Sequence, residues 1–107
     1  MDKSSTGLNP NLAALLSYLF GWVSGVIFYL IEAKSEYVRF HAAQSIIVFG
    51  AISIIGILLF FIPFLGVLLG ILTLVLWILL MIKAYQGDKY KLPFAGDLAE
   101  KWAAKKV

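Results

Sequence analysis

The chain alternates long uncharged stretches with short charged ones. Residues 40–82 contain no Asp, Glu, Lys or Arg, and residues 4–31 are equally free of charge. As a single helix the longer stretch would extend about 65 Å, roughly twice the hydrocarbon thickness of a bilayer. Pro63 lies near its middle, where proline interrupts the helical hydrogen-bond ladder. The pattern therefore predicts two helices joined by a tight turn at Pro63, and one helix kinked there is the alternative.

The uncharged stretches predict an all-α membrane protein with three transmembrane helices. Asn9 or Asn11 can cap the first helix, with Pro10 tolerated in its first turn. The apolar part of that helix is longer than the 7–15 residues of a secretory signal core, so we expect it to be retained. The predicted spans cover residues 11–31, 40–61 and 65–85.

Residues 86–107 form a more polar tail. Asp97 can cap a short amphipathic helix that carries Leu98 and Trp102 on one face. We expect this helix to lie at the membrane interface with its lysines near anionic head groups. A frayed, solvated end is the alternative. Residues 1–107 then form a single transmembrane domain.

Composition supports a lipid environment. The chain is 62% hydrophobic and 14% charged, against about 25% charged residues in soluble domains. Eight of the nine basic residues fall in the loop at 32–39 or beyond residue 82, and only Lys3 precedes the first helix. By the positive-inside rule we expect a multi-pass protein of the cell membrane with its N-terminus outside and its C-terminus in the cytoplasm.

Several kinds of chemistry lack the residues they need. There is no cysteine, which excludes thiol catalysis and cysteine metal sites, and a single histidine does not favour any other metal site. The net charge of +3 is too small and too localised for nucleic acid binding. Nucleophile–base pairs, phosphate-binding glycine loops and paired intramembrane carboxylates are also missing from the sequence. We therefore expect no enzyme activity and no cofactor.

Small residues recur at helical spacing on two of the predicted helices. Such faces let two helix backbones approach closely, which association in lipid requires. Packing between helices of the same chain is one interpretation; homo-oligomerisation and a pore lined by these faces are the others. The candidate packing residues are Ser17, Gly21, Gly25, Gly66, Gly70 and Thr73.

Polar residues gather around the loop between the first two predicted helices. Glu32 ends the small-residue face of the first helix, so it could meet Arg39 or His41. Ionisable groups at membrane depth are usually paired and often functional. Helix capping, a substrate or proton site, and contact with a partner all remain open. The cluster is Glu32, Arg39, His41, Gln44 and Ser45.

Three segments resemble a known family. They are Leu16-Ser-Tyr-Leu-Phe-Gly-Trp22, Val38-Arg-Phe-His-Ala-Ala-Gln-Ser45 and Ala84-Tyr-Gln-Gly-Asp-Lys-Tyr-Lys-Leu-Pro93. Together they are similar to small prokaryotic membrane proteins grouped with the Tic-type chloroplast import component. Plastid members are associated with protein import and are described with four spans, whereas this chain offers three. The resemblance thus implies a role in translocation as one alternative.

The sequence as a whole predicts a non-enzymatic structural or interaction subunit in the lipid bilayer. It would bind itself, or a larger membrane complex, through its small-residue faces. An oligomeric channel or protein-translocation component is the alternative, because the polar face of the first helix ends in Glu32.

Overall fold

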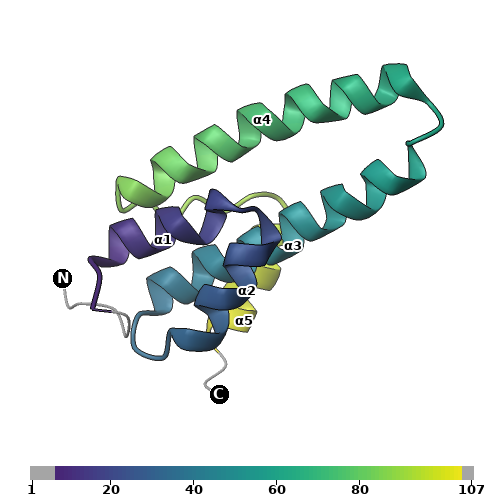
Figure 1. Cartoon of the computed structure of the whole chain (residues 1–107). Coiled ribbons are helices and arrows are strands. Elements are labelled where there is room, and N and C mark those ends of the chain that lie inside the picture. The colour runs from purple at the N-terminus through teal and green to yellow at the C-terminus, as the bar shows by residue number, and fades with distance from the viewer. Residues whose placement is uncertain (1–6, 105–107) are drawn as a thin grey trace.

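A computed structural model describes residues 7–104, and within them the chain folds into five α-helices without a strand (Figure 1). Three helices are short and two are long. Their bounds are α1 (Pro10–Leu19), α2 (Trp22–Ile31), α3 (Glu36–Leu58), α4 (Pro63–Tyr85) and α5 (Ala95–Ala104).

Helices α3 and α4 form a long antiparallel hairpin. Each has 23 residues and is long and apolar enough to cross a membrane, since 23 residues of helix extend about 34 Å. The chain reverses between Leu58 and Pro63, and Pro63 is the first residue of α4. The predicted turn is therefore confirmed and the kinked helix is wrong. The end of α4 at Tyr85 is as predicted, but α3 begins at Glu36, four residues early, because Ser35 caps it by accepting a hydrogen bond from the Val38 amide at 3.2 Å.

The first predicted span is wrong, because residues 11–31 are not one helix. The chain breaks at Gly21, which has φ 64° and ψ −136°, a backbone conformation open to glycine and strained for other residues. Helices α1 and α2 have ten residues each, or about 15 Å. Two helices of the described chain, not three, are thus long enough to cross a bilayer. No proline marks this break, so the prediction had no strong signal for it.

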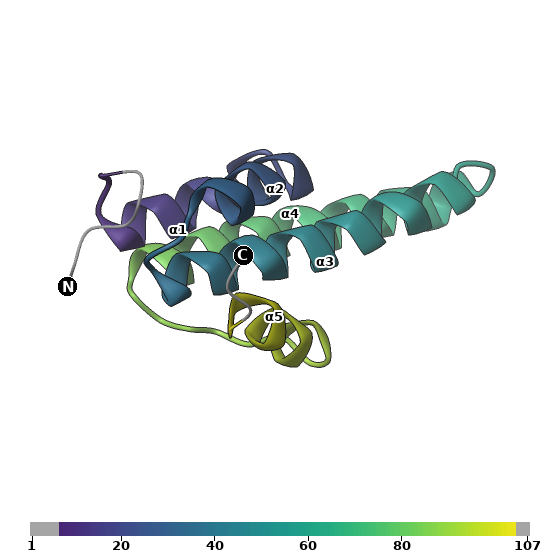
Figure 2. The ribbon, with the colours of Figure 1, turned by 90° about the horizontal axis from the view of Figure 1, so that it is seen from below.

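The short helices pack against one half of the long hairpin (Figures 1 and 2). A Cβ atom on Gly87, just beyond α4, would lie 3.4 Å from the Asn11 side chain at the start of α1. At the other end of α1, Trp77 Nε1 donates a hydrogen bond to the Tyr18 carbonyl at 2.8 Å. Helix α1 therefore runs antiparallel to the last part of α4. The start of α1 lies at the same end of the molecule as the end of α4, which does not fit an N-terminus across the membrane from the C-terminus.

Buried side chains are confined to the same half. The ten buried residues of α3 all lie between Val38 and Phe49, and the two of α4 are Leu80 and Ala84. From Gly50 to Leu79 no residue is buried. The core centres on Ala14, Tyr18, Phe49 and Leu80. Half of the hairpin thus carries the packed core, and the other half exposes apolar side chains.

The predicted C-terminal helix exists but packs differently from the expectation. Helix α5 begins at Ala95, so Asp97 lies in its first turn and is not its cap. Its buried residues are Gly96, Ala99 and Ala103; Ala99 and Ala103 lie against Phe40 and Ala43 of α3, Gly96 lies against Lys91 of the preceding loop, and Leu98 is exposed. Small residues allow this close approach, which explains why the larger Leu98 is not on the packed side. Residues 105–107 of the predicted tail lie outside the described residues.

Gly25 provides a test of the packing of α2 on α3. A Cβ atom there would lie 2.9 Å from the Ala42 carbonyl oxygen and 3.0 Å from Ser45 Cβ, whereas Gly50 has nothing within 4 Å. We expect Gly25→Ala to lower the free energy of unfolding in detergent by about 1–3 kcal/mol, since the helices must separate. Gly50→Ala is the matched control and should leave stability unchanged or raise it by up to about 1 kcal/mol. Equal stability of the two variants would contradict this packing.

Candidate functional site

The break between α1 and α2 leaves backbone groups without helical partners, and serine side chains replace those partners. Ser24 Oγ accepts a hydrogen bond from the Phe20 amide at 3.0 Å and lies 2.9 Å from the Ser17 carbonyl, to which it donates. Ser45 Oγ donates to the Gly21 carbonyl at 2.7 Å. Ser24 and Ser45 are buried, as is Ser17. Non-helical backbone is tolerated at membrane depth only where such partners surround it.

Tyr18 connects this break to a second polar group. Its hydroxyl lies 2.7 Å from His41 Nδ1, and His41 Nε2 lies 3.1 Å from the Asp88 carbonyl oxygen. A carbonyl can only accept, so Nε2 carries a hydrogen, and Nδ1 then accepts from the Tyr18 hydroxyl. These contacts fit the neutral tautomer of His41 that carries its hydrogen on Nε2. The ring therefore joins α1 to the loop after α4 through α3.

Gln44 holds the same loop one turn further along α3. Its amide nitrogen donates to the Tyr18 hydroxyl and to the Tyr90 carbonyl, each at 2.9 Å. Its amide oxygen accepts from the Leu92 amide at 3.0 Å. Gln44 is fully buried, and both of its amide hydrogens and its oxygen have partners. It acts as a clamp between α3 and the segment that leads to α5.

Arg39 binds the carboxyl ends of two helices. It donates to the Tyr29 and Glu32 carbonyls of α2 at 3.1 and 2.8 Å, and to the Ala103 carbonyl of α5 at 3.3 Å. Its guanidinium also lies over the Tyr29 ring, 4.5 Å from the ring centroid. A cation at helix carboxyl ends satisfies free carbonyls and complements the helix dipole. Arg39 thus fastens α2 and α5 to the start of α3.

Glu32 lies beside Arg39, as the sequence allowed. Its carboxylate accepts hydrogen bonds from the Lys34 and Ser35 amides at 3.1 and 3.0 Å. The carboxylate therefore orders the short connection between α2 and α3, and the Glu32 carbonyl receives Arg39.

All five residues of the predicted polar cluster are buried in one half of the molecule. Arg39 donates to the Glu32 backbone carbonyl, His41 and Gln44 meet at Tyr18, and Ser45 binds the helix break. Their contacts are with this chain's own backbone and side chains. The sequence did not single out Tyr18 or Tyr37, whose hydroxyl donates to the Ala84 carbonyl at 2.7 Å. For Tyr18 the available signal was a polar hydroxyl inside an uncharged stretch, whereas Tyr37 lies among charged residues and gave no such signal.

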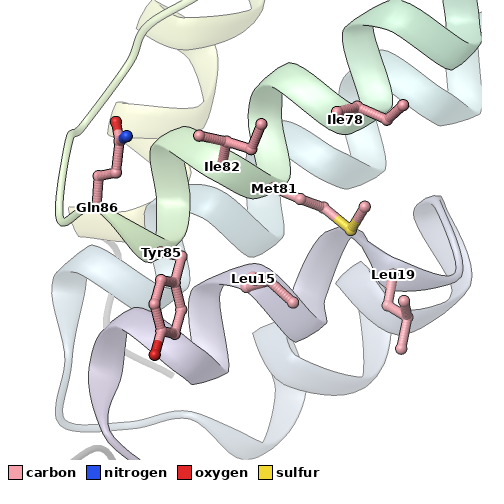
Figure 3. Close-up of a pocket in the computed structure, with 7 residues that line it drawn as sticks. All are labelled: Leu15, Leu19, Ile78, Met81, Ile82, Tyr85 and Gln86. Atoms are coloured by element: carbon pink, nitrogen blue, oxygen red, sulfur yellow. The ribbon is translucent and has the colours of Figure 1, made fainter.

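A groove of about 470 Å³ lies between α1 and α4. Figure 3 shows Leu15 and Leu19 of α1 across from side chains of α4. The lining is apolar except at one end, where Tyr85 and Gln86 contribute polar atoms. A groove of this composition suits hydrocarbon, such as a lipid tail, and offers no set of catalytic groups.

Ion pairs fasten α5 to the preceding loop outside the long helices. Lys91 lies 3.1 Å from Asp97 and 3.2 Å from Glu100, and Lys89 lies 2.9 Å from Glu100. Hydrogen bonds with Asp97 and Glu100 raise the pKa of Lys91, and those from Lys89 and Lys91 lower the pKa of Glu100. The pairs are exposed, so each contributes little to stability.

Metal ligation finds no support in the described part of the chain. Within residues 7–104, no three His, Cys, Asp or Glu residues gather into a group that could hold an ion. The fold and the polar network instead define a helical membrane protein whose buried polar groups hold its own helices together.

Comparison with known proteins identifies the family. Residues 5–99 match the magnetosome magnetite crystal formation protein family, and the chain belongs to it. A UPF0132 membrane protein of Methanocaldococcus jannaschii is 47% identical over 106 residues, which is 96% of each chain. Another, from Archaeoglobus fulgidus, is 42% identical over 97 residues, which is 87% of this chain and 94% of the relative. These relatives support a membrane location.

The remaining comparisons qualify the picture. No solved structure was found to match the chain. The matched family is also not the Tic-type family that the sequence motifs resemble, and nothing in these comparisons supports a Tic-type assignment.

Removing the clamp at Gln44 should release the loop that precedes α5. We expect Gln44→Leu to speed hydrogen exchange at the Leu92 amide, because that amide loses its acceptor and the Tyr90 carbonyl loses its donor. The substitution should also lower the free energy of unfolding by about 1–3 kcal/mol. Gln86→Leu is the control, since Gln86 is exposed. Leu92 exchange that stays as slow as in the unaltered chain would contradict the role of Gln44.

Proposed function

We propose that this chain is a non-enzymatic membrane protein that acts as a structural or interaction subunit. The polar residues that a catalytic site would need are engaged in holding helices together, from the break at Gly21 to the loop at Tyr90. The groove between α1 and α4 adds only aliphatic side chains and the polar ends at Tyr85 and Gln86.

The proposed topology has two crossings and one partial insertion. The α3–α4 hairpin crosses the bilayer, and α1 and α2 enter from the side on which α4 ends and turn back at Gly21. The exposed apolar tip of this short hairpin supports insertion, because Phe20 is 73% exposed and Trp22 is 44% exposed. Lysines and Arg39 concentrate at the end that bears α5, which favours the cytoplasmic side for that end.

The proposed contact surface is the outer half of α4. The predicted packing glycines divide into two groups. Gly21 and Gly25 lie against α3, with Cβ positions 3.6 Å from Phe49 and 2.9 Å from Ala42. Gly66 and Gly70, by contrast, have nothing within 4 Å. This difference is the observation that carries the proposal, since small residues at i and i+4 suit close packing by another helix.

A second copy of the chain is the proposed partner for this surface. Thr73 lies on the same face one turn beyond Gly70, and its hydroxyl bonds back to the Leu69 carbonyl at 2.7 Å. The face formed by Gly66, Gly70 and Thr73 therefore carries only small side chains, and its one hydroxyl already donates a hydrogen bond. Two identical faces of this kind can approach closely in lipid, where dispersion contacts drive association.

The family name concerns magnetite crystal formation. For this chain we propose a part in organising the membrane and not in holding iron. Glu32 orders the connection between α2 and α3, Asp97 and Glu100 pair with lysines, and no three acidic or His residues of the described chain gather into a group that could hold an ion.

A channel or protein-translocation component remains the alternative that the Tic-type resemblance suggests. In this fold the serine hydroxyls of α1 and α2 donate to backbone carbonyls, and the Tyr18 hydroxyl binds His41 and Gln44, so a polar path would have to form between copies. Flux through liposomes that contain the purified chain would favour this alternative.

Cysteine cross-linking can test the contact surface, because the chain has no cysteine of its own. Single cysteines placed at Gly66, Gly70 or Thr73 should form disulfide-linked dimers in liposomes. Cysteines at Leu68 or Val75, on the opposite face of α4, should do so far less. Linkage that is equal on both faces, or absent at every protein-to-lipid ratio, would overturn the proposed surface.

A further inference from the structure

The molecule has a wide half and a narrow half. In the wide half, helices α1, α2 and α5 gather around one end of the α3–α4 hairpin. The narrow half consists of the other end of that hairpin alone (Figures 1 and 2). The burial pattern agrees, since buried residues of α3 end at Phe49 and no residue between Gly50 and Leu79 is buried.

The length of α1 relates this division to the bilayer. Helix α1 pairs with α4 from Gly87, beside Asn11, to Trp77, which binds Tyr18. That interval is about 15 Å of helix, or half of a hydrocarbon core of about 30 Å. The hairpin of α1 and α2 therefore occupies one leaflet and ends near the bilayer midplane.

The side chains of the wide half fit this placement. The outward side of α2 is apolar, with Ile27 51% and Leu30 72% exposed. The groove beside Leu15 and Leu19 is apolar as well. A surface of this kind is stable in lipid and unfavourable in water, so the wide half belongs inside the leaflet and not outside it.

The leaflets therefore accommodate different amounts of protein. One leaflet holds α1, α2 and parts of both long helices, with α5 packed on α3, while the other holds only the two long helices. Each helix with its side chains is about 10–12 Å across. The cross-section of the protein is thus much larger in one leaflet than in the other.

We propose that the chain is a membrane wedge that prefers and promotes curvature, with the leaflet that holds α1 and α2 on the convex side. Bending in that direction expands the leaflet that accommodates the wide half and relieves the packing mismatch around the narrow half. This inference rests on the two-crossing topology of the proposed function. It also gives the contact at Gly66 and Gly70 a geometric consequence, because copies that touch through their narrow halves must tilt apart at their wide ends.

Vesicles of different diameter provide the test. The full chain with Lys101→Cys, labelled with a fluorophore, is reconstituted at low density into phospholipid vesicles that are then sorted by size. An impermeant quencher measures the fraction of label on the outside. We expect the ratio of outside to inside label to rise severalfold as diameter falls, because an outward wide half lies in the convex leaflet.

Two variants make the result specific. A label at Phe61→Cys, in the turn of the narrow half, should show the opposite trend. Gly50→Trp combined with Ala51→Trp adds bulk to the narrow half, where Gly50 has free space and Ala51 is exposed. This double variant should weaken the dependence on diameter and leave the fold intact.

A separate measurement distinguishes failure of the wedge from failure of the topology. Impermeant thiol reagents should reach Gly7→Cys and Lys101→Cys from the same side of the membrane. Reaction from opposite sides would overturn the topology and the wedge together. Reaction from the same side, combined with an orientation ratio independent of diameter, would overturn the wedge alone.

Discussion

The structure depends on how an interrupted backbone is satisfied in apolar surroundings. At Phe20 and Gly21 the chain leaves the helix, and each freed amide or carbonyl would cost several kcal/mol in hydrocarbon. Ser24 and Ser45 supply hydroxyls to this break, and Trp77 donates to the Tyr18 carbonyl. These contacts come from α2, α3 and α4. The turn is therefore stable only when the helices around it are assembled.

That requirement links the break to the rest of the polar network. Helix α3 carries His41, Gln44 and Ser45 within little more than one turn, and each binds a different part of the chain: His41 the Asp88 carbonyl, Gln44 the Leu92 amide and Ser45 the Gly21 carbonyl. Arg39 adds the ends of α2 and α5. A short run of α3 is thus the docking site for every other element in the wide half. Beyond Phe49 this run ends, and so does the packed core.

The sequence predicted the lipid environment, the α3–α4 hairpin and its turn at Pro63, because these follow from long uncharged stretches and from the covalent restraint of proline. It also identified the five polar residues between Glu32 and Ser45 that the structure buries. It did not predict the break at Gly21. Glycine is frequent in membrane helices, so only tertiary partners such as Ser45 and Trp77 decide whether the chain turns there.

The small-residue pattern predicted close helix packing but not which glycines pack within the chain. The spacing of Gly21 and Gly25 matches that of Gly66 and Gly70, so the sequence treats the two pairs alike. The fold distinguishes them, because α3 lies against the first pair and nothing in the described chain lies against the second. Which glycines pack internally is a property of the assembled helices and not of the spacing.

The most direct test of the central claim is the distance between spin labels at Leu12 and Leu30 in the reconstituted protein. If residues 11–31 formed one helix, these positions would be separated by about 27 Å along its axis. The hairpin of α1 and α2 predicts a distance well below that value, because both positions lie near the same end of the molecule. A distance at or above the continuous-helix value would contradict the account.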